Sequence, residues 1–131
     1  MKYALVLLFF NTLACMRPTI ELNYSHPNAG AAQFFINHTQ ERFIQDATKA
    51  RKWIQEELLL KAFDFRSTAS TTLLHILFFD SQTEAIRFEK INNLHKSTVL
   101  RSVLNGAVLY VIESDDKHKA DELVGLFVGK E

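Results

Sequence analysis

Hydrophobic and polar positions in the second half of the chain predict strands. Phe63 and Phe65 alternate with charged neighbours over residues 61–66, which is the two-residue period of a half-buried strand. Residues 73–79 form a short, almost continuous apolar run, which favours a central strand over a helix. A hydroxyl-rich connector joins the two segments, and together they predict a hairpin.

A second hairpin is predicted further along the chain. Two β-rich runs, 98–104 and 107–112, flank the dipeptide Asn105-Gly106. Asn-Gly is a strong signal for a type I′ turn, because that turn requires a positive φ at both of its central residues. This hairpin is the most specific local feature of the sequence.

An apolar stripe upstream of these strands predicts a long helix over residues 31–62. Its members recur at spacings of 4, 3, 4 and 4, which places them on one helical face. They are Phe43, Ala47, Ala50, Ile54 and Leu58. Trp53, the only tryptophan, lies one step off this stripe, and we expect it at the border of the core.

Two further helices are predicted, one after each hairpin. Ser81 and Glu84 have the spacing of a capping box, in which each side chain satisfies a free backbone donor of the first turn. Ser114 or Asp115 is expected to cap the last helix, and Gly129 to end it.

The elements therefore follow as one helix and then two units of strand, strand and helix. This order predicts an α+β fold in which residues 31–131 form a single domain. Its sheet would have four strands, mainly antiparallel, with helices on one face. A ferredoxin-like arrangement that uses only βαββα is the alternative.

The first 15 residues have the pattern of an export leader. Lys2 is followed by an apolar run over residues 4–14, which is shorter than the roughly 20 residues that span a bilayer. A positive start, a short apolar core and small residues before a cut are typical of a signal peptide. Residues 16–30 are rich in turn formers and predict a tether. The alternative is that residues 3–10 form a buried first strand.

The stretch Thr12-Leu13-Ala14-Cys15 resembles the processing site of bacterial lipoproteins. The resemblance implies that Cys15 carries a diacylglyceryl group and becomes the first mature residue. Residues 78–127 also look like the C-terminal part of small exported lipoproteins of Gram-positive bacteria. The matching stretches are Phe79 to Ala85 and Asn105 to Leu109. This family implies a membrane anchor, but it implies no activity and no functional residue.

Charge and cysteine content disfavour several function classes. Fifteen basic residues balance fifteen acidic ones, and nucleic-acid binding draws on an excess of Lys and Arg. Cys15 is the only cysteine, so the chain can form no intramolecular disulfide and no Cys-rich metal site. The five histidines contain no pair at a metal-ligand spacing. We therefore predict no nucleic-acid partner, no metal, no cofactor and no catalytic residue.

Two function classes remain. The first is a small exported module, secreted or lipid-anchored in the cell envelope, that binds a protein partner or a second copy through a sheet face or edge. The second is a cytoplasmic, dimeric ferredoxin-like domain that acts as a small enzyme or a ligand sensor. Its pocket between sheet and helices would use His75, Arg101 and Tyr110, which are chosen from their places in the predicted strands.

Overall fold

A computed structural model describes residues 19–97 and 99–129 of the chain. The leader and Cys15 lie outside the described residues. No helix of the described part is both long and apolar enough to cross a membrane. In chain order the elements are α2 (Ala29–His38), β1 (Phe43–Gln45), two 3₁₀ turns (Ala47–Lys49 and Glu56–Leu58), β2 (Lys61–Ser67), β3 (Leu73–Phe78), α3 (Gln82–Ile91), a further 3₁₀ turn (Leu94–Lys96), β4 (Leu100–Asn105), β5 (Val108–Glu113) and α4 (Lys117–Phe127).

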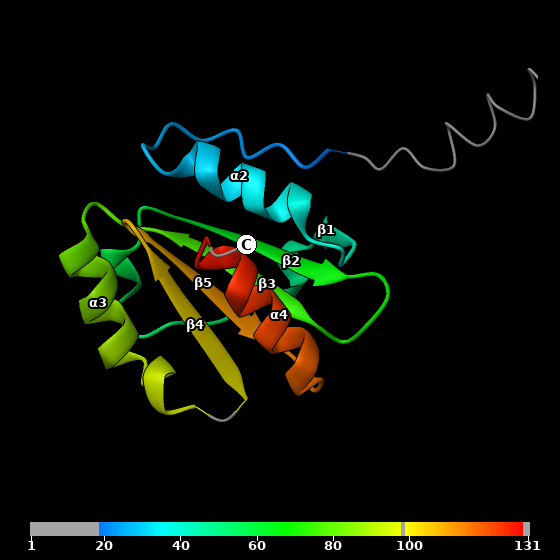
Figure 1. The fold of residues 1–131 in the computed structure, drawn as a ribbon. Coiled ribbons are helices and arrows are strands. Elements are labelled where there is room, and N and C mark those ends of the chain that lie inside the picture. Colours follow the sequence, from blue (N-terminus) through cyan, green and yellow to red (C-terminus); the bar gives the residue numbers. More distant parts are fainter. Residues whose placement is uncertain (1–18, 98, 130–131) are drawn as a thin grey trace, which may run out of the picture.

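The strands form one antiparallel sheet in the order β1-β2-β3-β5-β4 (Figure 1). This confirms the α+β class and the four predicted strands, to which the short β1 is added at one edge. β3 and β5 occupy the centre and pair from Leu73↔Glu113 to Phe78↔Val108. From β3 onward the chain follows the βαββα order of the ferredoxin-like alternative. β4 is left at the second edge of the sheet.

Helices cover both faces of the sheet, where the sequence predicted them on one. α2 and α4 cover one face, and Tyr110 and Phe127 belong to the core between them and the sheet. α3 covers the opposite face, together with the loop that carries Trp53. The reason is that β3 and β5 are buried at almost every position, so both of their faces need a cover.

The long helix predicted over residues 31–62 is wrong beyond His38. α2 ends there, and the segment that follows forms β1 and pairs with β2. Pairing with an existing strand satisfies the backbone of this segment, and this tertiary gain overrides a spacing that only resembled a helical stripe. Of the predicted stripe, Phe43 and Leu58 contact the core, whereas Ile54 is exposed.

Residues 20–28 pack on the domain, although the sequence predicted a tether up to residue 30. Leu22 is only 5% exposed and belongs to the core under α2. The N–H and the carbonyl of Ile20 both bond to the side chain of Asn37 in α2, each at 2.9 Å. Nε2 of His26 donates to the carbonyl oxygen of Phe79 at 2.7 Å. Residues 20–28 are therefore part of the folded domain.

Of the caps predicted for the last two helices, the bond to Ser81 is found at α3, and the cap of α4 is shifted by one residue. Oγ of Ser81 accepts a hydrogen bond from the N–H of Glu84 at 3.3 Å. Asp116, one residue beyond the predicted Asp115, caps α4 by accepting from two N–H groups of its first turn. Gly129, with a φ of 85°, follows the last turn as expected.

The β4–β5 hairpin is confirmed, but its turn lies one residue further along the chain. Asn105 pairs with Val108, so the two loop residues are Gly106 and Ala107. Only Gly106 has a positive φ, of 66°, which is the pattern of a type II′ turn and not of type I′. Oδ1 of Asn28 accepts from the N–H of Ala107 at 3.2 Å, which ties the turn to the start of α2.

Replacing Gly106 by alanine is expected to destabilise the fold by about 1–2 kcal/mol. The alanine would keep a positive φ, and its Cβ would lie 2.7 Å from Nδ2 of Asn28. Gly125→Ala is the matched control, because Gly125 lies inside α4 with open space at its Cβ position. Gly125→Ala is expected to raise the free energy of unfolding by about 0.5–1 kcal/mol. Thermal unfolding measures both variants, and equal melting temperatures would contradict this description of the turn.

Candidate functional site

His75, in the middle of β3, points to the α3 face of the sheet and is bonded to the neighbouring strand. Its Nδ1 lies 2.6 Å from Oδ1 of Asp64, its cross-strand partner on β2. An ionised carboxylate only accepts hydrogen bonds, so Nδ1 carries the proton and donates it. An Asp that fixes one ring nitrogen in this way orients a histidine for acid–base chemistry or for metal binding.

The second ring nitrogen of His75, Nε2, has no hydrogen-bond partner. Among residues 19–97 and 99–129, it is the only buried side-chain nitrogen or oxygen that lacks a hydrogen-bond partner. Oε2 of Glu113 lies 3.9 Å away, which is beyond hydrogen-bond distance. Nε2 is therefore the atom of this cluster that could accept a proton or bind a metal ion, because Asp64 holds the proton of the ring on Nδ1.

The His75 ring is nevertheless closed off from solvent. Its exposed fraction is 0%, and Trp53 covers it edge-on with ring centroids 5.6 Å apart. Arg51 lies over the Trp53 ring and bonds to Glu113 at 3.0 Å, which holds this cover in place. Trp53 therefore lies at the border of the core, as expected. The cluster joins β2, β3 and β5 and presents no open site.

Arg101 and Tyr110, the other two predicted pocket residues, lie on the opposite face of the sheet from His75. Tyr110 is buried and stacks on Phe127 with ring centroids 4.5 Å apart. Burial raises the pKa of its phenol above the ordinary value of 10.0. Arg101 lies 3.4 Å from the carboxylate of Asp121 in α4. The three residues do not converge, and the open depression of about 560 Å³ beside residues 22–33 contains none of them.

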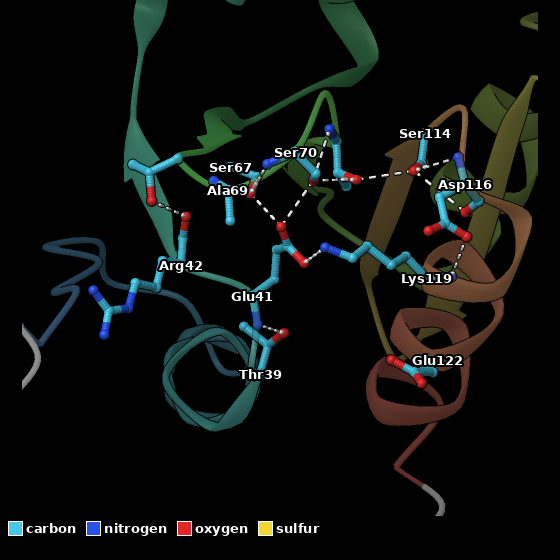
Figure 2. A network of polar contacts seen from close by, with 12 residues as sticks. Thr39, Glu41, Arg42, Ser67, Ala69, Ser70, Ser114, Asp116, Lys119 and Glu122 are labelled. Atoms are coloured by element: carbon cyan, nitrogen blue, oxygen red, sulfur yellow. Dashed lines mark hydrogen bonds and ion pairs between the residues drawn. The ribbon is translucent and has the colours of Figure 1, made fainter. Parts of the chain in front are cut away.

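A second open depression, of about 440 Å³, lies between the end of α2 and α4, and a polar network borders it (Figure 2). Oε1 of Glu41 accepts from the hydroxyls of Ser67 and Ser70, the latter at 2.8 Å. Oε2 of Glu41 pairs with Nζ of Lys119 at 3.0 Å. These groups satisfy one another and join the start of β1, the β2–β3 turn and α4, so we assign the network a structural role. The depression is lined by His38, Thr39, Gln40, Glu41, Lys119, Glu122, Leu123 and Leu126.

The stability of the protein is expected to fall in acid because of Glu41. Burial alone would raise the pKa of Glu41, but hydrogen bonds from Ser67, Lys119 and Ser70, together with the charge of Lys119, hold it below its ordinary value of 4.5. A pKa that is lower in the folded state stabilises the fold above the unfolded value, and this contribution is lost as the pH falls.

Glu41→Gln tests this contribution. The variant is expected to be less stable than the parent near neutral pH and to show a smaller loss of stability on acidification, because it has no proton to take up at this position. Urea midpoints between about pH 7 and about pH 3 measure both effects. Parallel pH profiles of parent and variant would contradict the assignment.

The outer edge of β4 carries backbone groups that no described residue pairs with. In a hairpin with a two-residue loop the first pair is hydrogen-bonded, and bonded pairs then alternate with non-bonded ones. Ser102 and Leu104 therefore direct their N–H and C=O groups away from β5. The alternation is consistent with the pairing on the other side of β5. There the residue next to Val108, Ala107, directs its carbonyl toward β3 and accepts from the N–H of Phe79 at 2.9 Å.

This edge lacks the devices that usually protect an edge strand. β4 contains no Pro and no Lys, and its one charged residue, Arg101, is paired with Asp121 of α4. Val99, directly before the strand, is 57% exposed. The other edge strand, β1, is only three residues long. Because short strands, charges and Pro are what prevent pairing with another chain, β4 is the edge that is open to it.

The comparisons with known proteins give no relative: no family model, no curated protein and no solved structure matches the chain. The resemblance to exported lipoproteins therefore stays a prediction. Within residues 19–97 and 99–129, no group of three His, Cys, Asp or Glu side chains could hold a metal ion.

Sequence reasoning missed Asp64 and Glu113, and it expected binding at a sheet face or edge without identifying β4 as the open edge. A signal for Asp64 was present, because Asp64 and His75 are equally far from the middle of the connector between the first two strands. Strands joined as a hairpin bring such positions opposite each other. A strand was predicted over residues 98–104, but its place at the edge depends on β5 pairing with β3, which no local pattern reports.

Proposed function

We propose that this chain is a small exported module, anchored by a lipid on Cys15, that binds another polypeptide strand at the edge of β4. It acts by binding and not by catalysis. The observation that carries the proposal is the outer edge of β4, where Ser102 and Leu104 have backbone groups without partners among residues 19–97 and 99–129.

Strand addition suits this edge for a simple reason. An incoming strand extends the ladder with main-chain hydrogen bonds, and the alternating side chains of β4 provide selectivity. β4 is held rigid because it pairs with β5 from Leu100↔Glu113 to Asn105↔Val108. The enclosed His75 and the fully bonded Glu41 favour binding over catalysis, since neither presents a reactive group at the surface.

The anchor is supported by the leader pattern that ends at Cys15. Its test is the mass and the N-terminus of the protein from its native host. We expect a membrane-bound chain that starts at Cys15 and carries the mass of a diacylglyceryl group. An intact Met1 in the soluble fraction would overturn export. A start a few residues after Cys15 would replace the anchor with secretion.

The binding edge is tested by a photo-reactive benzoylphenylalanine at Val99 of the full chain in its host. We expect an adduct with a polypeptide that persists in a Ser102→Ala background and disappears in a Ser102→Pro background. Proline removes the outward N–H without breaking the ladder to β5, whereas alanine keeps it. The same probe at Ile44, which is 39% exposed on β1, is the control. No adduct at Val99, or one that Ser102→Pro leaves unchanged, would overturn the proposal.

A further inference from the structure

We infer that the strand that pairs with β4 is β4 of a second copy of this chain, antiparallel and related by a two-fold axis at Ser102. This inference rests on the proposed function and names its partner. It starts from the outward backbone groups of β4. Pairing about Ser102 places Ser102 opposite Ser102 of the second copy and Leu100 opposite its Leu104. All of these residues lie at the positions whose backbone groups point away from β5. In the single chain the N–H of Leu100 donates to Oγ of Ser97 at 2.9 Å, and pairing would replace this acceptor with the carbonyl of Leu104 of the second copy.

The side chains of β4 have the symmetry that such pairing requires. On the α3 face the strand reads Leu100, Ser102, Leu104, which is the same sequence of residue types in both directions. A two-fold axis at Ser102 therefore brings leucine against leucine at both ends of the pair. A C2 interface needs one patch that complements itself. The Leu100, Ser102 and Leu104 row meets this need, because each residue lies opposite one of its own type.

Charge selects this register over a neighbouring one. With the axis at Ser102, Arg101 lies opposite Val103 of the second copy. A shift of the axis to Arg101 would place the two arginines directly opposite each other, and like charges at that position are destabilising. The hydroxyl of Ser102 donates to Glu89 of α3 at 2.7 Å, so the residue at the axis has its side-chain hydrogen bond already.

Two wider properties favour a second copy over an unrelated strand. The formal net charge of the chain is zero, so two copies meet without long-range repulsion. A lipid on Cys15 would hold many copies on one surface, and this confinement raises the effective concentration of β4 edges for one another. An edge that pairs in solution as the concentration rises is therefore more fully paired on the membrane.

Disulfide trapping tests the two-fold axis directly. In the full chain with Cys15→Ser, the Ser102→Cys variant is expected to form a covalent dimer on mild oxidation. The two Cα atoms would be about 5.5 Å apart across the axis, within the range that a disulfide spans. Arg101→Cys is the matched control and is expected to stay monomeric, because its direct partner is Val103. Equal trapping of both variants, or more with Arg101→Cys, would overturn the inference.

A second measurement avoids the introduced cysteine. In sedimentation velocity, the full chain and its Ser102→Ala variant are expected to associate as concentration rises, whereas Ser102→Pro is expected to sediment as a monomer with a circular dichroism spectrum like the parent's. Monomers throughout would overturn the second copy. An adduct at Val99 with another protein, combined with no trapping of Ser102→Cys, would overturn this inference alone and leave the proposed function intact.

Discussion

Replacing Phe78 by alanine is expected to lower the free energy of unfolding by about 3–5 kcal/mol. Phe78 is fully buried at the end of β3. Its ring lies 5.1, 4.9 and 5.8 Å, between centroids, from the rings of Tyr24, His26 and Phe63. Truncation removes this apolar surface and leaves a cavity that the strands around it cannot close. It also removes the surface on which residues 20–28 pack.

Urea unfolding of the purified chain measures this loss. Phe34→Ala is the control, because Phe34 is 55% exposed on α2 and its truncation is expected to change stability by less than about 0.5 kcal/mol. Limited proteolysis adds a local readout, since residues 20–28 are expected to be cut first in Phe78→Ala. Similar midpoints for the two variants would show that Phe78 does not hold the core.

Replacing Asp64 by alanine is expected to lower the free energy of unfolding by about 2–3 kcal/mol, which is more than the net contribution of one typical hydrogen bond. The change removes the acceptor for Nδ1 of His75, whose Nε2 already has no partner. The buried imidazole would then have no hydrogen bond at either ring nitrogen. The desolvation of that ring is the source of the loss, because a buried polar group without a partner costs more than a satisfied one contributes.

A double-variant series separates this effect from lost packing. Asp64→Asn keeps a side-chain oxygen as acceptor and is expected to lose less than Asp64→Ala. Asp64→Ala combined with His75→Leu is expected to regain part of the loss, because the leucine needs no hydrogen bond. Denaturant midpoints measure all three variants. If Asp64→Asn and Asp64→Ala unfold at the same midpoint, the hydrogen bond to His75 does not contribute to stability.

The parts of the fold that the sequence predicted are those that local chemistry determines. Asn105-Gly106 marked the β4–β5 hairpin, because a tight turn needs a residue that tolerates positive φ. Ser81 marked the start of α3, because its hydroxyl accepts from the first-turn amide of Glu84. The alternation of Phe63 and Phe65 marked β2, whose apolar side faces the core.

The parts that the sequence did not predict depend on partners that are distant in the chain. Phe43 joined a helical spacing by coincidence, and its pairing with Ser67 decides that the segment is a strand. Both faces of β3 are apolar. This pattern indicates that both faces are covered, but it does not indicate which helix covers each face. The three residues of the predicted pocket lie apart for the same reason. His75, Arg101 and Tyr110 all lie in strands, but the odd and even positions of paired strands separate them onto two faces.

The sheet order has a consequence for how the chain folds. β3 has one neighbour at once, β2, but its other neighbour lies far downstream: Ile76 pairs with Tyr110. Until β5 arrives, the uncharged Leu73–Phe78 flank is bare, and such a segment readily stacks on copies of itself. We therefore expect docking of the β4–β5 hairpin onto β3 to limit the rate of refolding, and aggregation to compete with it until β5 has paired with β3.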